Sequence, residues 1–329
     1  MEKELLRVEN LVTEFYGKEY PIRAVDHVSF HVNRGEILGI VGESGCGKSV
    51  TSMSVMRLIP EKAGRVAEGK IFFDGRDILA MSRKEFSSIQ GKEMSMIFQE
   101  PLSSLNPLQK CGYQIVESLL YHEHMKKKEA WKKAAELLEL VGIPLPEKRV
   151  KEYPHQLSGG MRQRVMIAMA IACNPRLLIA DEPTTALDVT IQAQILDIMK
   201  RLRAEMGMAV MFITHDMGVI ADISDRVLVM YAGNTVEEAP VKEFFKNPLH
   251  PYTRGLLKAV PRPDEKKEKL YMIPGSVPGP DEQYKMKGCK FCGRCSLAME
   301  ICKEVRPVMT EVEKGHKTAC HLYGQETGR

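Results

Sequence analysis

Four short segments of the chain are almost entirely apolar and are bounded by turn-forming or charged residues. They cover residues 36–41, 177–180, 208–214 and 226–231. Runs of this length without polar alternation are typical of strands that are buried on both faces of a parallel sheet. We therefore expect a parallel sheet at the centre of the fold.

Two other segments alternate between apolar and polar positions. Val28, Phe30 and Val32 are spaced two residues apart, and residues 70–78 read as extended sequence around Asp74 and Gly75. An Asp-Gly pair between extended segments predicts a tight hairpin turn. The alternation indicates an antiparallel layer beside the parallel sheet.

A helical pattern occupies residues 131–141, where Trp131, Ala134, Ala135, Leu138 and Val141 recur at three- and four-residue steps. The lysines of residues 126–133 fall mostly on the opposite face, as on a solvated helix. Strands that alternate with helices predict an α/β fold. The helical segment reads as an insertion into that fold, at about residues 101–173.

Composition excludes several classes of protein. With 44% hydrophobic and 27% charged residues, the chain has enough apolar material for a folded core. The longest apolar run, residues 165–173, is about half of the ~18–20 residues that a membrane-crossing helix requires. No signal-peptide pattern is found before Glu14, so we expect a cytosolic chain. A net charge of +4 is too balanced to indicate a nucleic-acid partner.

The C-terminal part differs in composition from the rest. After residue 247, prolines crowd around a charged run at 265–269, which is typical of a linker. Five of the eight cysteines lie in the last 41 residues. A reducing cytosol disfavours disulfides, so this cluster predicts a metal or redox site.

A glycine-rich loop follows the first of the expected strands directly. Residues 42–49 read GESGCGKS, match GxxxxGK[ST], and precede a helix-compatible stretch that Pro60 ends. In such a loop, backbone N–H groups and a helix N-terminus surround phosphates, Lys48 reaches the β and γ phosphates, and Ser49 ligates magnesium. The order of strand, loop and helix predicts a nucleoside triphosphate site.

Two carboxylates end the expected strand at residues 177–180. Asp181 would hold magnesium through water, and Glu182 would be the general base that polarises the attacking water. An acidic N-cap explains one carboxylate more easily than two. His215, at the end of the strand at 208–214, is a candidate sensor of the γ-phosphate.

A second candidate anion site is the segment LSGGMRQR at residues 157–164. Ser158 and two glycines begin a strongly helical run, where a helix N-terminus presents free N–H groups. A serine N-cap with a glycine hinge would give the same pattern. The residues alone leave these two interpretations open.

Taken together, the motifs resemble those of ATP-binding-cassette ATPases. The chain carries, in the family's order, the glycine loop, Gln99 in MIFQEP, LSGGMRQR, LLIADEP, Ala186-Leu187-Asp188 and Thr214-His215-Asp216. The resemblance covers about residues 5–247 and implies a RecA-like P-loop core, an antiparallel β subdomain and a helical subdomain at about 101–173. We therefore expect a nucleotide-binding domain at residues 1–247 and a small cysteine-containing C-terminal extension at 248–329.

The resemblance also implies roles for single residues. Glu182, His215 and Gln99 would serve catalysis, and Ser49, Gln99 and Asp181 would hold magnesium. In a head-to-tail dimer, the Ser158 segment would contact ATP on the partner, and Asp188 would lie at the interface. The residues expected to bind nucleotide are Phe15, Tyr16, Gly42, Glu43, Ser44, Gly45, Cys46, Gly47, Lys48, Ser49, Val50, Gln99, Ser158, Gly159, Gly160, Asp181 and Asp188.

Two points within this set stay open. Either Phe15 or Tyr16 would stack on adenine, because both lie where the family places an aromatic residue. Cys46 stands where many members have serine, and we expect its thiol to be sensitive to alkylation beside the nucleotide.

The remaining segments narrow the resemblance to ATP-binding subunits of dipeptide and oligopeptide importers. They are LNP at 105–107, NPLHPYTRGLL at 247–257, IPGSVPG at 273–279 and the terminal cysteines. Such a subunit would hydrolyse ATP at the cytoplasmic membrane face with a second ATPase or a copy of itself, two permease subunits and an external solute-binding protein. Nickel and glutathione importers share this subunit type, so the cargo stays open.

The same resemblance implies a metal centre in the extension. The family pattern places its cysteines at Cys289, Cys295, Cys302 and Cys320, which would hold a [4Fe–4S] cluster and leave Cys292 as an extra thiol. Zinc is the alternative, with His316 and His321 as further possible ligands. Either centre would stabilise a tail that is poor in apolar residues.

Two other function classes fit less well. A soluble cassette protein that acts on nucleic acid or ribosomes would carry fused cassettes or a coiled-coil insertion, and the sequence has neither. A redox sensor with a secondary ATPase would not need all six nucleotide motifs. We therefore expect an importer ATPase.

Overall fold

The computed structural model describes residues 4–17, 19–99, 104–185, 187–260 and 271–323. Pro101, Ala186 and the charged run at 265–269 lie outside this part of the chain. The fold divides into two compact units that are interleaved along the sequence. Unit one contains residues 1–5, 32–36 and 73–213, and unit two contains residues 6–31, 37–72 and 214–329.

Unit one contains three parallel strands. They are β6 (Met94–Ile97), β7 (Leu177–Asp181) and β8 (Ala209–Ile213), with β7 between the other two. Every residue of β7 and β8 is buried, which explains why both segments are apolar throughout. The strands expected at 177–180 and 208–214 are confirmed.

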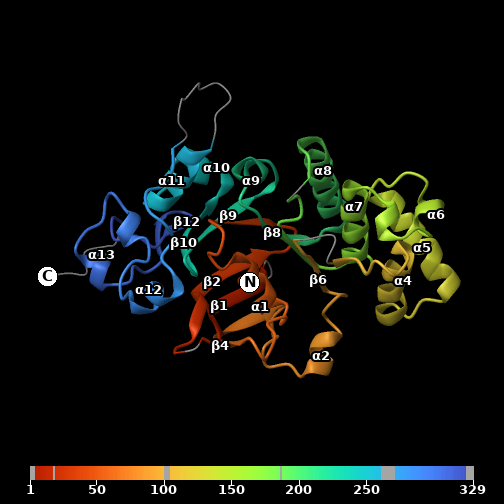
Figure 1. Cartoon of the computed structure of the whole chain (residues 1–329), viewed down its shortest axis with the longest axis horizontal. Coiled ribbons are helices and arrows are strands. Elements are labelled where there is room, and N and C mark those ends of the chain that lie inside the picture. The colour runs from red at the N-terminus through yellow and green to blue at the C-terminus, as the bar shows by residue number, and fades with distance from the viewer. Residues whose placement is uncertain (1–3, 18, 100–103, 186, 261–270, 324–329) are drawn as a thin grey trace. The chain divides into compact units, whose positions relative to one another are not determined.

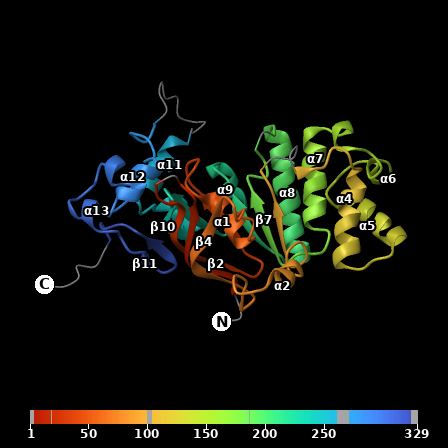
Figure 2. The same cartoon turned by 60° about the horizontal axis from the view of Figure 1, so that its bottom comes forward.

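The helices of unit one pack largely against one another. The helices α4 (Cys111–His122), α5 (Lys127–Leu140), α6 (Pro146–Arg149) and α7 (Gly159–Ala170) gather together, with a 3₁₀ turn at Pro154–Gln156, as Figure 1 shows. In α5, Ala134 and Leu138 are buried while Lys132 is exposed, as the helical pattern predicted. The long helix α8 (Val189–Met206) runs beside α7 in both views (Figure 2).

Unit one also contains the predicted hairpin turn. The strand β4 (Gly64–Phe73) ends at this turn, and β5 (Arg76–Asp77) begins after it. Asp74 and Gly75 have φ values of 50° and 77°, as a tight two-residue turn requires. A short helix, α2 (Arg83–Ser87), follows and begins with a capping box formed by Ser82 and Glu85.

Unit two is built on two sheets. One has β1 (Glu4–Phe15) between β2 (Ile22–Asn33) and β4. In the other, β3 (Ile37–Val41) pairs in parallel with β9 (Arg226–Tyr231), and β10 (Asn234–Pro240), β12 (His316–Thr318) and β11 (Thr310–Glu313) continue it antiparallel. The remaining helices of this unit are α1 (Lys48–Val55), α9 (Met217–Ile223), α10 (Val241–Lys246), α11 (Pro251–Ala259), α12 (Pro280–Lys285) and α13 (Ile301–Glu304).

The C-terminal extension is joined to unit two by its strands and its core, and not by a linker alone. In the extension, β12 pairs with β10 through Glu237↔Thr318, so the extension adds two strands to the sheet. Tyr252 and Phe291 are buried in one apolar cluster with Tyr231 of β9. A few aromatic residues thus give the extension a core that its proline-rich composition does not reveal.

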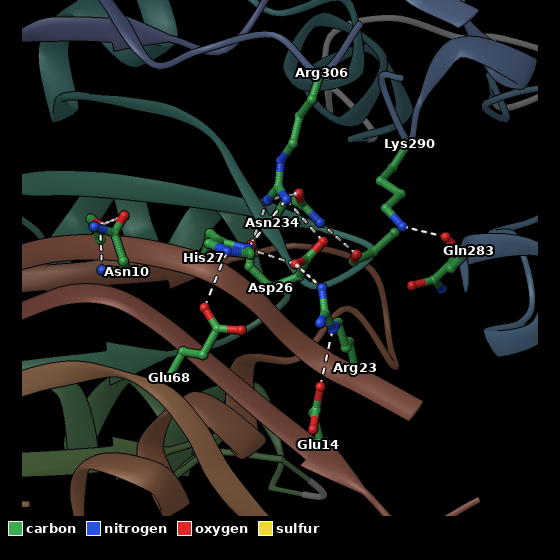
Figure 3. A network of polar contacts seen from close by, with 12 residues as sticks. Asn10, Glu14, Arg23, Asp26, His27, Glu68, Asn234, Gln283, Lys290 and Arg306 are labelled. Atoms are coloured by element: carbon green, nitrogen blue, oxygen red, sulfur yellow. Dashed lines mark hydrogen bonds and ion pairs between the residues drawn. The ribbon is translucent and has the colours of Figure 1, made fainter. Parts of the chain in front are cut away.

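Polar contacts strengthen the same junction. Nη1 of Arg306 in the extension donates a hydrogen bond to Oδ2 of Asp26 in β2, at 3.1 Å. Nη2 of Arg306 donates to Oδ1 of Asn234 (Figure 3). Asp26 also accepts from His27 at 2.8 Å. Although burial alone would raise the pKa of Asp26, Arg306 and His27 lower it overall.

None of the helices formed by described residues is long and apolar enough to cross a membrane.

Candidate functional site

The glycine loop lies between β3 and α1, as the sequence predicted. Gly47 has φ 99°, and a Cβ at this position would stand 2.4 Å from the carbonyl oxygen of Ala24. Only glycine fits such a tight left-handed position. Because α1 begins at the next residue, the loop presents its backbone at a helix N-terminus, which favours anions.

Lys48 points into the loop that carries it. Its ammonium donates to the carbonyl oxygens of Gly42 at 2.7 Å and Glu43 at 3.2 Å, and the side chain is only 5% exposed. The ammonium nitrogen also lies 3.8 Å from Sγ of Cys46. A buried cation held by two neutral carbonyl groups and a thiol is poorly compensated and can exchange these partners for phosphate oxygens. The loop therefore has the donor set that a triphosphate requires.

The thiol of Cys46 is less accessible than expected. The residue is 1% exposed, and burial raises the pKa of its thiol despite the nearby ammonium of Lys48. A buried, protonated thiol is a weak nucleophile. Burial of the thiol therefore argues against the expected sensitivity to alkylation.

In unit one, Asp181 and Glu182 stand at the end of β7. Asp181 is buried, and Glu182 adopts φ 47°, a conformation that non-glycine residues seldom adopt. Gln99 follows β6, and its amide donates to Oε2 of Glu182 at 3.0 Å. The structure thus brings Gln99 and Glu182 together at the carboxyl ends of neighbouring parallel strands.

The LSGG segment forms an exposed helix N-terminus. Ser158 caps α7 by accepting from the N–H of Met161 at 3.3 Å, and Gly159 has open space around it. A Cβ on Gly160 would come within 2.9 Å of Ile191 in α8, so this glycine permits close packing of two helices. The serine N-cap is therefore confirmed, and anion binding at this exposed helix N-terminus stays a prediction.

The other predicted residues lie at element ends. Asp188 caps α8 by accepting from the N–H of Ile191 at 2.9 Å. His215 is exposed and precedes α9. At the end of β1, Phe15 is half-buried, while the ring of Tyr16 is 58% exposed.

Sequence reasoning missed two residues of the extension that contact the glycine loop. The hydroxyl of Tyr252 accepts from the N–H of Glu43 at 2.9 Å. Arg294 forms a two-pronged ion pair with the carboxylate of Glu43. Both lie more than 200 positions from Glu43, so local pattern gives no signal for these contacts.

The C-terminal cysteines converge on one small cavity of about 20 Å³. Its lining includes Cys289, Cys292, Cys295, Cys302, Cys320 and His321. Burial raises the pKa of Cys289 to about 12, so its thiol is protonated at neutral pH. Within the described ranges, no three His, Cys, Asp or Glu residues are grouped closely enough for one metal ion.

His316 is not part of this cavity. It is buried in β12, and its Nε2 lies 2.8 Å from Oε1 of Glu237. The expected role of His316 as a zinc ligand is therefore wrong. His321 does line the cavity, and its Nε2 lies 2.9 Å from the carbonyl oxygen of Val305.

Comparison with protein families gives two matches. The model described as "ABC transporter" matches residues 25–185. The model described as "Oligopeptide/dipeptide transporter, C-terminal region" matches residues 236–302. The second match covers the segment that links β10 to the cysteine cluster.

Curated relatives match over nearly the whole chain. The oligopeptide transport ATP-binding protein AppD of Bacillus subtilis is 51% identical over 322 residues, which is 98% of each chain. OppD of the same organism is 53% identical over 95% of this chain and 87% of its own. The dipeptide transport ATP-binding protein DppD of B. subtilis is 49% identical over 99% of this chain and 96% of its own.

Solved structures agree in fold. The ATP-binding cassette MJ0796, a dimer in a post-hydrolysis state with ADP and phosphate, has a TM-score of 0.65 and 29% identity over 72% of this chain and 99% of its own. CbiO1 of Clostridium perfringens has a TM-score of 0.63 and 26% identity over 75% of this chain and 92% of its own. The chain therefore belongs to the ATP-binding-cassette family, among the ATPase subunits of oligopeptide and dipeptide transporters.

Proposed function

We propose that this chain hydrolyses MgATP at the cytoplasmic face of the cell membrane and thereby drives the uptake of di- or oligopeptides. One observation carries the proposal. Over nearly its full length, the chain is 51–53% identical in sequence to oligopeptide transport ATP-binding proteins. The match of the extension to the oligopeptide/dipeptide transporter region favours peptides over nickel or glutathione.

The residues of the site divide the chemistry between them. Lys48 and the loop N–H groups would bind the phosphates, and Ser49, Asp181 and Gln99 would hold the magnesium ion, which would neutralise phosphate charge. Glu182 accepts a proton from the attacking water, and Gln99 orients the carboxylate through their hydrogen bond. His215 contacts the γ-phosphate. Of the two aromatic candidates, we assign adenine stacking to Tyr16, because its ring is the more exposed.

The assembly is a head-to-tail pair of cassettes. The exposed N-terminus of α7 suits binding to ATP on the other cassette, and MJ0796 is described as a dimer. This chain carries every motif intact, so the pair is formed with a homologous ATPase or with a second copy of the chain. Two permease subunits and an external solute-binding protein complete the importer. Residues 1–247 form the cassette, with its helical subdomain at about 101–173, and 248–329 the extension.

Reconstitution tests the proposed transport activity. The chain is assembled in proteoliposomes with the permease subunits, the partner ATPase and the solute-binding protein that co-purify with it, and uptake of a labelled dipeptide, a pentapeptide, Ni²⁺ and glutathione is compared. We expect ATP-dependent uptake of a peptide only. Lys48→Ala should abolish uptake, while the control Lys62→Ala, at an exposed position, should retain it. Uptake of Ni²⁺ or glutathione in place of peptides would assign the chain to the alternative.

We also propose that the cysteine cluster holds a [4Fe–4S] centre through Cys289, Cys295, Cys302 and Cys320. Five thiols around one cavity supply the ligands that such a centre requires. Zinc stays the alternative, because four thiolates suit either centre.

Elemental analysis separates these alternatives. After anaerobic purification, iron and sulfide at about four each per chain would support the cluster. One zinc per chain without sulfide would support zinc. A protein that contains neither iron nor zinc would exclude both centres. The centre would stabilise the extension, so its loss should lower the thermal midpoint.

A further inference from the structure

The glycine loop is fixed at one residue by the C-terminal extension. The N–H of Glu43 donates to the hydroxyl of Tyr252, so the backbone at this position is directed at the extension. The carboxylate of Glu43 pairs with both terminal nitrogens of Arg294, at 2.7 and 3.2 Å. The extension therefore holds both the main chain and the side chain of Glu43.

The part of the loop that follows Glu43 is closed by a hydrogen bond from the N–H of Cys46 to the carbonyl oxygen of Glu43, at 3.2 Å. Ser44 and Gly45 are exposed, and a Cβ on Gly45 would meet nothing within 4 Å. The conformation of this arm is therefore set where its ends are fixed, at Glu43 and at the buried Cys46. A shift of Glu43 would move the N–H groups that receive the phosphates.

Arg294 is itself held in place by the extension. Its Nε donates to the carbonyl oxygen of Pro274 at 2.8 Å, and its side chain is 8% exposed. The guanidinium lies 5.7 Å from the ring centre of Tyr231 and 6.0 Å from that of Phe291. Because these contacts fix the guanidinium, the ion pair positions Glu43, and not the reverse.

The strength of this contact follows from its geometry and burial. A forked guanidinium–carboxylate pair combines two charge-assisted hydrogen bonds and fixes the relative orientation of the two planes. An exposed ion pair would be screened by solvent, but Arg294 is nearly buried and Glu43 is about three-quarters buried. Removal of the arginine would leave the carboxylate under-compensated beside the phosphate site.

We propose that Arg294 is a positioning residue of the nucleotide site: by fixing Glu43, it sets the affinity of this chain for ATP. The inference rests on the proposed binding of ATP by the glycine loop. It assigns to the extension a direct part in nucleotide binding, beyond a part in stability or in assembly.

Titration with a fluorescent ATP analogue and Mg²⁺ tests the proposal on the full chain. Arg294→Met keeps the apolar packing on Tyr231 but removes the fork, and Glu43→Gln removes the carboxylate charge. Each should weaken binding about tenfold, in the range by which coupled contacts modulate affinity. The double variant should bind no more weakly than either single variant, because both remove the same contact. Arg294→Lys, which retains the charge, should fall between Arg294→Met and the wild type.

Arg254→Met is the matched control. Arg254 lies in the extension and contacts the Pro248 carbonyl and the Tyr323 hydroxyl, away from the loop. The Arg254→Met substitution should lower the thermal midpoint but leave the affinity for ATP unchanged. In the assembled importer, Arg294→Met should raise the KM for ATP and leave kcat at saturating ATP unchanged.

Several outcomes would overturn the inference. It fails if Arg294→Met and Arg294→Lys bind with wild-type affinity, if the effects of Arg294→Met and Glu43→Gln add in the double variant, or if Arg254→Met weakens binding equally. Lys48→Ala is measured in the same titration. Loss of binding in Lys48→Ala together with wild-type affinity in Arg294→Met would refute the role of Arg294 and leave the nucleotide site standing. Wild-type binding by Lys48→Ala would refute the site itself.

Discussion

Gln99 donates a hydrogen bond to Glu182, with its amide nitrogen 3.0 Å from Oε2 of the carboxylate. The hydroxyl of Thr185 donates to the same oxygen, also at 3.0 Å. The backbone of Glu182 adopts φ 47°, a conformation that costs roughly 1–3 kcal/mol for a non-glycine residue. Two donors and an unusual backbone conformation thus fix the direction of one carboxylate, as a general base requires.

Glu182→Gln should therefore separate binding from turnover. The amide has nearly the same shape and should leave ATP affinity close to the wild type. It cannot accept the proton of the attacking water, so kcat in the assembled importer should fall about 10²–10⁴-fold. Glu205→Gln on the exposed face of α8 is the control and should hydrolyse normally. Hydrolysis at the wild-type rate by Glu182→Gln would place the base elsewhere.

Ser158 allows a test of the head-to-tail pair without loss of the helix. Its side chain caps α7, and aspartate and asparagine cap helices about as well as serine. In a Glu182→Gln background with saturating ATP, Ser158→Asp should prevent dimerisation, because it sets a negative charge against the partner's triphosphate.

Ser158→Asn is the matched variant, since it keeps the cap without the charge. It should still dimerise with ATP. Light scattering of the purified chain, and of the chain mixed with its partner ATPase, measures both. ATP-dependent dimers of the Ser158→Asp protein as stable as those of the parent would contradict the model.

The sequence reveals the buried strands because their environment is the same on both faces. β7 and β8 are apolar at nearly every position and could be predicted from one short window. β6 could not, because it is four residues long and includes Ser95. β1 was also missed, since Arg7, Glu9 and Asn10 interrupt its apolar residues.

The polar core of unit two could not be predicted from local pattern. Glu237 and Glu238 in β10 are adjacent charged residues, yet they are 0% and 5% exposed. Glu237 is compensated by His316, which lies 79 residues later, and by the N–H groups of Leu249 and His250. Such a carboxylate is recognisable only when the fold has brought its partners to it. The glycine loop, in contrast, carries its chemistry within a few residues.

The buried His250 makes stability depend on pH. Its Nδ1 accepts from the N–H of Tyr252 at 3.0 Å and caps α11, so the ring must be neutral at this nitrogen. Burial lowers the pKa of His250 from 6.5 to about 4. Between these values the unfolded chain binds a proton that the folded chain does not. Stability from this residue is therefore complete above pH 6.5 and is lost as pH falls towards 4, by up to about 3 kcal/mol.

His250→Asn keeps a good N-cap and removes the titration. Urea unfolding of the wild type and the variant between pH 7.5 and 4.5 measures the difference. We expect the wild type to lose stability over this range by more than the variant does. Parallel pH profiles would show that His250 does not titrate in this window.

The cysteine cluster should contribute to the stability of the extension. Without its metal, the extension should be less stable but still folded. Cys302 is buried, and the N–H of Cys289 donates to its carbonyl oxygen at 2.8 Å. We expect Cys302→Ser to lose iron and sulfide and to lower the thermal midpoint by several degrees, because the extension loses one of its constraints. The aromatic cluster of Tyr231, Tyr252 and Phe291 remains, so unfolding should stay cooperative. Cys292→Ser, in the thiol outside the expected ligand set, is the matched control and should keep its metal. If Cys292→Ser lost the metal and Cys302→Ser kept it, the ligand set would have to be redrawn around Cys292.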